Sequence, residues 1–212
     1  ASTKWLHASS SSAPNQSMQG LRTIPAYVGH RLSSVSGTRL NSNDGNDSLE
    51  PQVISPHEEL RKELKGTNLF LVGMMGSGKS TVGEQLAKDL GYRFIDTDEV
   101  CEYMIEMPIS DFFAQGKEKQ FREVEHQTLM ELAQYTRTIV STGGGIVANV
   151  ENWGLLHHGI VVFLDTSTND IYNRLKDNPE EVAKRPLLQT EDPLNTLNEL
   201  RNKRLNMYQK AD

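Results

Sequence analysis

A glycine-rich segment, residues 73–80, constrains the fold of this chain more than any other feature. Its sequence, GMMGSGKS, matches the phosphate-binding loop pattern G-x-x-x-x-G-K-[S/T] at every fixed position. A continuous apolar run, residues 69–72, precedes it, and apolar residues recur at helical spacing behind it. This order of strand, glycine loop and helix separates a phosphate-binding loop from a chance match. The segment therefore predicts an α/β fold that binds a nucleotide beside a parallel sheet.

The residue types of the loop suit a nucleoside triphosphate. Glycines let the backbone turn so tightly that several N–H groups point at one anion. Lys79 can place a positive charge beside the β- and γ-phosphates, and the Ser80 hydroxyl can bind Mg²⁺.

Composition limits the remaining possibilities. With 212 residues, of which 36% are hydrophobic, the chain can bury one sizeable core. Its net charge of −6 gives no reason to expect a nucleic-acid partner. The single cysteine excludes an internal disulfide framework. No run approaches the roughly 18 apolar residues that span a bilayer, so we expect a soluble protein with no membrane partner.

An N-terminal arm, residues 1–60, differs in composition from the rest. Residues 1–43 are rich in serine and contain four basic residues but no acidic one. This composition is typical of a transit peptide for a plastid or mitochondrion, and an ordinary disordered polar arm is the alternative. Residues 57–64 have a high helix propensity and predict a short flanking helix. We expect the folded domain to occupy residues 61–212.

Two carboxylates follow a second predicted strand, residues 92–95. Asp96 and Asp98 alternate along what we expect to be an extended segment, so their side chains should point the same way. Ligands of open α/β sheets bind at the carboxyl ends of the strands. One carboxylate could therefore lie near Mg²⁺ and the other near an acceptor hydroxyl. A pair of exposed turn carboxylates is the alternative.

Two further patterns suggest where an acceptor binds. Arg122 and Glu125 lie three residues apart on a predicted helix, either as a surface ion pair or as a guanidinium that is held to meet a substrate carboxylate. Residues 143–145 are three consecutive glycines that follow a third apolar strand, 138–140. Such glycines indicate close approach of the backbone to a ligand, with a flexible turn as the alternative.

A polar segment, residues 177–192, resembles a closing lid. It contains Arg185, which could act as an arginine finger on the phosphates. A solvated charged loop is the alternative interpretation. The segment leads into a predicted amphipathic helix, residues 194–208.

Taken together, residues 67–212 resemble the shikimate kinases, small enzymes of the nucleoside monophosphate kinase structural group. The motifs that carry the resemblance are residues 73–80, Asp96-Thr97-Asp98, Phe121-Arg122 with Glu125, Thr142-Gly143-Gly144-Gly145, Arg185-Pro186-Leu187-Leu188, and Lys203-Arg204 before Tyr208. The resemblance implies a P-loop three-layer α/β/α fold with a central parallel sheet, a helical substrate-binding subdomain and a lid. It implies ATP-dependent phosphorylation of the 3-hydroxyl of shikimate, a step toward chorismate and the aromatic amino acids.

The resemblance also implies roles for individual residues. Those that would hold ATP are Gly76, Ser77, Gly78, Lys79, Ser80, Thr81 and Arg185. Ser80 would bind Mg²⁺ directly and Asp96 through water. The residues that would bind shikimate are Asp98, Arg122, Gly143, Gly144, Gly145 and Arg204. Catalysis would rest on Lys79, Asp98 and Arg185.

The resemblance carries further expectations. Family members usually have glycine and serine where this chain has Glu106 and Pro108. We therefore expect the substrate subdomain of this chain to depart locally from the usual shape. The family continues beyond Asp212 with a strand and a helix, so we expect this chain to be C-terminally incomplete. We also expect a monomer that is located in a plastid, where plants and algae house this route.

Two other functions compete with this one. Another small-metabolite kinase of the same group, such as a gluconate kinase, would share the glycine loop. A catalytically silent homologue could serve as a binding module. Such a homologue is expected to lack the phosphate lysine or the acceptor carboxylate, whereas this chain retains Lys79, Ser80 and Asp98.

Overall fold

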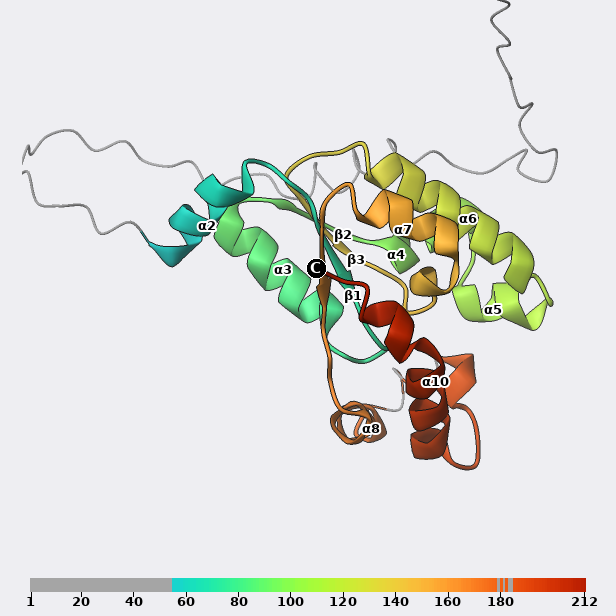
Figure 1. Cartoon of the computed structure of the whole chain (residues 1–212). Coiled ribbons are helices and arrows are strands. Elements are labelled where there is room, and N and C mark those ends of the chain that lie inside the picture. The colour runs from blue at the N-terminus through green and yellow to red at the C-terminus, as the bar shows by residue number, and fades with distance from the viewer. Residues whose placement is uncertain (1–54, 179, 181, 183–184) are drawn as a thin grey trace, which may run out of the picture.

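Four short parallel strands form the sheet on which the loops of this protein are mounted (Figure 1). The computed structural model describes residues 55–178, 180, 182 and 185–212. The strands are β1 (Leu69–Val72), β2 (Arg93–Asp96), β3 (Thr138–Ser141) and β4 (Ile160–Phe163), in the spatial order β2-β3-β1-β4. All four residues of β1 are buried, as expected for a central strand that is covered on both faces.

Helices connect these strands and cover the sheet. They are α2 (Pro56–Leu64), α3 (Lys79–Leu90), α4 (Thr97–Ile105), α5 (Ile109–Ala114), α6 (Glu118–Leu132), α7 (Val150–Leu156), α8 (Thr168–Lys176) and α10 (Pro193–Tyr208), with short 3₁₀ turns η2 (Ile146–Ala148) and η3 (Pro186–Leu188). Within the described ranges, no helix is both long and apolar enough to cross a membrane.

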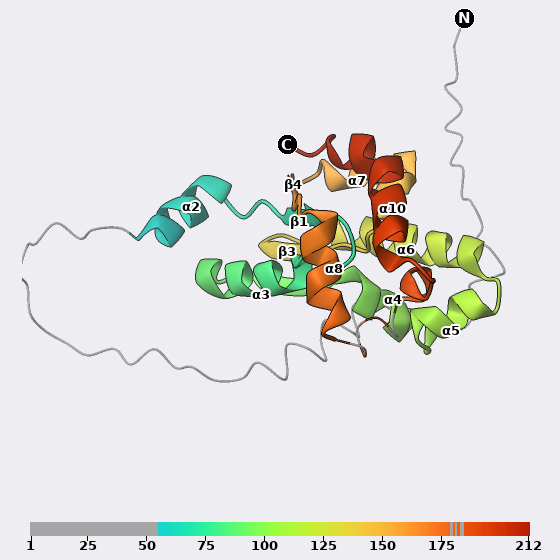
Figure 2. The same cartoon turned by 90° about the horizontal axis from the view of Figure 1, so that it is seen from below.

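The two faces of the sheet bury two separate cores. Leu69 and Leu71 point to one face and pack with residues of α2 and α3, whereas Phe70 and Val72 point to the other and pack with residues of α4, α6, α7, α8 and α10. Figures 1 and 2 show α3 on one side of the strands and α6, α7 and α10 on the other. The predicted three-layer α/β/α fold is therefore confirmed.

The flanking helix predicted over residues 57–64 is present as α2. It begins one residue earlier, at Pro56, so it spans the boundary that was predicted at residue 60 between arm and domain. Ser55 and Glu58 form a capping box at its start, in which each side chain accepts a hydrogen bond from the other residue's backbone N–H. The predicted transit peptide and most of the predicted arm lie outside the described residues.

Glu106 marks a local departure in the backbone. It ends α4 with a φ of +57°, in the left-handed region that favours glycine. This explains in physical terms why a glycine suits this position in the family that the sequence resembles. Pro108 follows as the N-cap of α5.

Gly83 sets the distance between α3 and the sheet. A Cβ atom at this position would lie 2.6 Å from the Phe94 ring and 3.1 Å from the Leu71 side chain. We expect Gly83→Val to lower the free energy of unfolding by about 1–3 kcal/mol through overpacking. Gly154→Val is the matched control, since nothing lies within 4 Å of a Cβ there. Urea denaturation of both variants measures this, and equal stabilities would contradict the packing argument.

Candidate active site

The glycine loop connects β1 to α3 at the carboxyl edge of the sheet. Gly73 has a φ of +149°, and a Cβ atom there would lie 2.8 Å from the Leu164 carbonyl oxygen. Gly76 has a φ of +74° and faces Ile171 at 3.1 Å from its Cβ position. Side chains at these positions would be strained, so the tight loop requires glycine.

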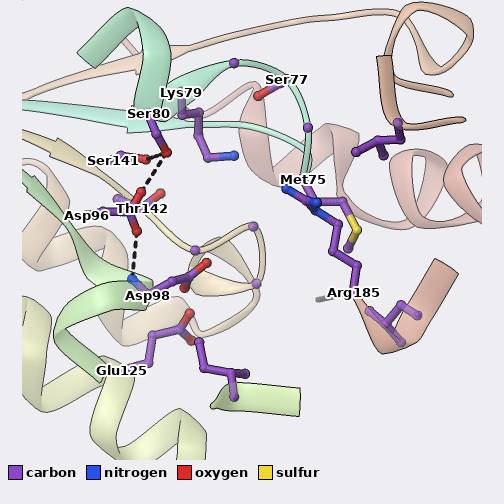
Figure 3. A pocket seen from close by; sticks show the side chains of 18 of the residues that line it. Met75, Ser77, Lys79, Ser80, Asp96, Asp98, Glu125, Ser141, Thr142 and Arg185 are labelled. Carbon is purple, nitrogen blue, oxygen red and sulfur yellow. Dashed lines mark hydrogen bonds between the residues drawn. The ribbon is translucent and has the colours of Figure 1, made fainter. Parts of the chain in front are cut away.

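Lys79 lies buried inside the curve of this loop (Figure 3). Its Nζ donates hydrogen bonds to the carbonyl oxygens of Gly73 at 3.0 Å and Met74 at 2.8 Å. Burial lowers the pKa of Lys79 to about 8, although the carboxylates of Asp98 and Asp96 oppose this shift. The ammonium group is thus held where a phosphate would meet it.

Ser80 joins the loop to the second strand through Asp96. The Ser80 hydroxyl donates to Asp96 Oδ2 at 2.7 Å and lies 3.2 Å from the Ser141 hydroxyl. Hydroxyl and carboxylate oxygens are the donors that Mg²⁺ prefers, usually with phosphate oxygens of the substrate. Among the described residues, no cluster of three or more acidic, histidine or cysteine side chains could hold a metal alone. The donor set therefore fits an ion that is shared with a nucleotide.

The predicted geometry of Asp96 and Asp98 was wrong. Asp98 lies in the first turn of α4 rather than on an extended segment, because Asp96 caps this helix. Asp96 Oδ1 accepts a hydrogen bond of 2.9 Å from the Asp98 backbone N–H, a typical role for an aspartate at an N-cap. Both side chains nevertheless line one cleft, since the helix begins directly at the strand end.

Asp98 has the electrostatic surroundings of a proton acceptor. Asp98 is exposed to solvent where it lines the cleft, and its carboxylate lies within electrostatic range of Asp96 and Glu125. Burial, together with the carboxylates of Asp96 and Glu125, raises the pKa of Asp98 to about 7 in the absence of ligands, and Lys79 opposes this shift. A carboxylate with this pKa can exchange a proton near neutral pH.

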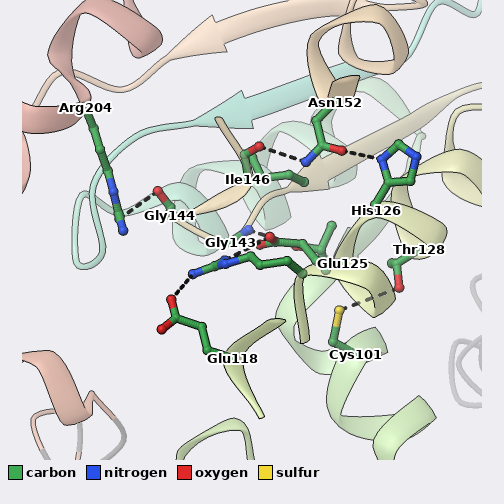
Figure 4. Close-up of polar contacts among 12 residues, drawn as sticks. Cys101, Glu118, Glu125, His126, Thr128, Gly143, Gly144, Ile146, Asn152 and Arg204 are labelled. Carbon is green, nitrogen blue, oxygen red and sulfur yellow. Dashed lines mark hydrogen bonds and ion pairs between the residues drawn. The ribbon is translucent and has the colours of Figure 1, made fainter. Parts of the chain in front are cut away.

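Arg122 and Glu125 form a partly buried pair rather than a solvated one. Arg122 Nη1 donates to Glu125 Oε2 at 2.9 Å, and Arg122 Nη2 lies 3.4 Å from Glu118 Oε1 (Figure 4). Glu125 is only 2% exposed, and its Oε1 forms no hydrogen bond within the described part of the chain. The guanidinium also lies over the ring of Phe121, with its carbon 5.5 Å from the ring centroid. These contacts hold the guanidinium at the cleft wall.

The three glycines approach these side chains closely. A Cβ atom on Gly143 would lie 2.5 Å from Asp98 Oδ1 and 2.9 Å from Glu125 Oε1. One on Gly145 would collide with the Arg122 guanidinium. Neighbours within the chain itself therefore exclude a side chain at Gly143 and at Gly145, whereas a Cβ atom on Gly144 would make only ordinary contacts. The backbone of residues 143–145 is left uncovered by side chains of its own toward the cleft.

The last helix contributes Arg204 to the same loop. Arg204 Nη1 donates to the Gly144 carbonyl at 3.0 Å, and the Tyr208 hydroxyl donates to the same oxygen at 2.8 Å. Tyr208 is fully buried and stacks on Phe163 of β4. The position of the segment 143–145 is thus fixed by side chains of α10.

One cleft of about 750 Å³ is lined by every ATP-binding, substrate-binding, metal-binding and catalytic residue that was predicted from the sequence. The predicted residues in its lining are Gly76, Ser77, Gly78, Lys79, Ser80, Thr81, Asp96, Asp98, Arg122, Gly143, Gly144, Gly145, Arg185 and Arg204. Arg185 comes from the predicted lid, of which residues 179, 181, 183 and 184 lie outside the described part.

The structure adds one cation that sequence reasoning missed. Arg174 on α8 lines the cleft, and its Nη1 donates to the Ser77 carbonyl at 3.4 Å. Its sequence neighbours, including Ile171 and Leu175, have the pattern of an ordinary amphipathic helix. Only the packing of α8 beside the glycine loop distinguishes Arg174 from a surface residue.

Comparisons with known proteins agree with this geometry. The family model described as shikimate kinase matches residues 75–212. A shikimate kinase of Trichormus variabilis is 46% identical over 149 residues, which cover 70% of this chain and 80% of the relative. One of Synechococcus sp. (strain RCC307) is 46% identical over 157 residues, covering 74% and 79%.

Solved structures give the same result. Shikimate kinase from Acinetobacter baumannii in complex with shikimate aligns with a TM-score of 0.65 and 35% identity, covering 71% of this chain and 83% of that one. Shikimate kinase from Aquifex aeolicus aligns with a TM-score of 0.55 and 35% identity, covering 68% and 83%. The chain belongs to the shikimate kinase family.

Proposed function

We propose that this protein transfers the γ-phosphoryl group of ATP to the 3-hydroxyl of shikimate, giving shikimate 3-phosphate and ADP. The observation that carries the proposal is the sharing of one cleft by Lys79, Asp98 and Arg122. Lys79 offers a cation for the phosphates, Asp98 a carboxylate for the acceptor hydroxyl, and Arg122 a guanidinium for the substrate carboxylate. These are the three groups that the reaction must bring together. Family membership favours shikimate over gluconate as the acceptor.

On the donor side, residues 76–81 would hold the phosphates of ATP. Lys79 would exchange its two carbonyl partners for phosphate oxygens, and Arg185 would neutralise charge on the transferring group. Ser80 and Asp96 would hold Mg²⁺, which supplies charge neutralisation on the β- and γ-phosphates when it is bound. Phosphoryl transfer needs mainly positioning and neutralisation, and these residues can provide both.

On the acceptor side, Arg122 and Arg204 would bind the shikimate carboxylate from two walls of the cleft. Arg122 already directs donors at Glu125 and Glu118, and Arg204 directs one at the Gly144 carbonyl, so the orientation of both guanidinium groups is restricted. Asp98 would accept the proton of the attacking hydroxyl. The bare backbone of residues 143–145 would let the ring lie close to the γ-phosphate.

Asp98→Asn is the first test. At pH 7.5 we expect kcat to fall by roughly 10²–10⁴-fold, because the amide cannot accept the hydroxyl proton. In the wild type, kcat/KM for ATP, measured at low ATP concentration, should fall about tenfold per pH unit below pH 7, since protonation of Asp98 removes the base. This decline should be absent in the variant. ADP release measures both effects.

Asp89→Asn is the matched control for this test, because Asp89 lies outside the lining of the cleft. Full activity of Asp98→Asn with shikimate would overturn the role of this carboxylate. A wild-type profile that stays flat from pH 5.5 to pH 8 would overturn the assignment of a base that titrates near pH 7.

Arg122→Gln tests the acceptor side. We expect KM for shikimate to rise by roughly 10–100-fold, as a charge-assisted hydrogen bond to the carboxylate is lost, while KM for ATP changes less than twofold. Lys119→Gln removes an exposed charge from the same helix and is the control. Equal increases in both KM values would indicate general damage to the fold instead of loss of a carboxylate contact.

We also propose that the protein is imported into a plastid. The support is the serine-rich, acid-free composition of residues 1–43. Residues 1–60 fused to a fluorescent protein should direct it to plastids when expressed in plant cells. Cytosolic fluorescence, or fluorescence in mitochondria, would contradict this.

A further inference from the structure

A second hollow lies at the opposite edge of the sheet from the cleft. Its volume is about 460 Å³, and the residues that line it are Lys65, Gly66, Gly91, Arg93, Thr136 and Arg137. They precede or begin β1, β2 and β3, so the hollow sits at the amino-terminal ends of three parallel strands. The four-residue strands, roughly 13 Å long, separate it from the glycine loop.

The lining is basic although the protein is acidic. Three of its six residues are cations, none is a carboxylate, and they come from three separate segments of the chain. A fourth cation, Arg61 of α2, lies beside the hollow, with Nη1 3.4 Å from the Cβ position of Gly91. Lys65, Arg93, Arg137 and Arg61 form no ion pair with any other residue in the described part of the chain. Their charges are therefore not engaged in ion pairs with carboxylates of the described residues.

Contacts within the chain hold these cations around the hollow. Arg93 Nη2 donates to the Thr136 carbonyl at 3.1 Å, and its guanidinium carbon lies 5.3 Å from the ring centroid of Tyr135. The Arg137 side chain passes over Gly66, with Cγ 3.5 Å from the Cβ position there. The Arg137 backbone N–H also donates to the Gly66 carbonyl at 2.9 Å. The Arg93 guanidinium is thus positioned in advance for a planar or tetrahedral anion, and the Arg137 side chain lies beside the same hollow.

We propose that this hollow is a binding site for a small phosphate-bearing anion, separate from the ATP site. The Arg93 side chain is held by a backbone carbonyl and an aromatic ring, so it loses little freedom when it binds phosphate oxygens. An anion would also relieve the repulsion among the gathered cations. The ligand could be free inorganic phosphate or the phosphate group of a metabolite, since both present the same oxygens.

Amide NMR of the ¹⁵N-labelled full chain with saturating Mg·ADP tests the proposal. Inorganic phosphate and glycerol 3-phosphate are titrated separately, and the tighter ligand identifies the source. We expect saturable shifts of the Gly66 and Gly91 amides, with the Gly76 and Gly78 amides unchanged. No saturable shift at Gly66 and Gly91 with either ligand would overturn the site.

Paired charge variants sharpen the test. Lys65→Gln/Arg137→Gln should weaken binding at least about tenfold, whereas Lys62→Gln/Lys119→Gln, with the same change in net charge, should not. Neither control residue lines the hollow or the cleft. Arg137→Lys keeps the charge and shows whether the fold tolerates a change there. Equal weakening by the two double variants would mean that only overall charge attracts the anion, which would refute the proposal.

Discussion

The carboxylate of Asp96 is the contact on which the geometry of the cleft depends. One oxygen accepts from Ser80 at the start of the phosphate-binding helix, and the other accepts from the Asp98 backbone at the start of α4. A single side chain at the end of β2 therefore joins Ser80, the hydroxyl proposed to bind Mg²⁺, to Asp98, the proposed proton acceptor. The proposed donor and acceptor halves of the cleft are connected through this shared partner.

Two charged groups of the cleft oppose the stability of the fold. The pKa of Lys79 is lowered and that of Asp98 is raised, each chiefly by burial, so both groups are less readily ionised than in water. For Asp98 the folded state holds its proton more tightly than the unfolded state does, so its contribution to stability falls as pH rises from about 4 to about 7. Substrates that bring phosphate and hydroxyl groups would supply further partners for both side chains.

Sequence reasoning predicted the fold and the members of the cleft because they depend on local patterns. The glycine loop, the strand ends and the three glycines can each be recognised from a few consecutive residues. It was wrong about the backbone at Asp98, because the capping of α4 by Asp96 competes with extension of the strand. It missed Arg174 and the Tyr208–Gly144 contact, since these arise when segments far apart in the chain pack together. Distance in sequence, more than residue type, limited the prediction.

The hydrogen bonds of Lys79 have a consequence for nucleotide binding. The Lys79 ammonium joins the Gly73 and Met74 carbonyl oxygens from inside the loop. The loop is therefore held in place by a residue of its own chain. An arriving triphosphate replaces one set of partners with another instead of ordering a loose segment, and the entropic cost of ordering is met when the protein folds.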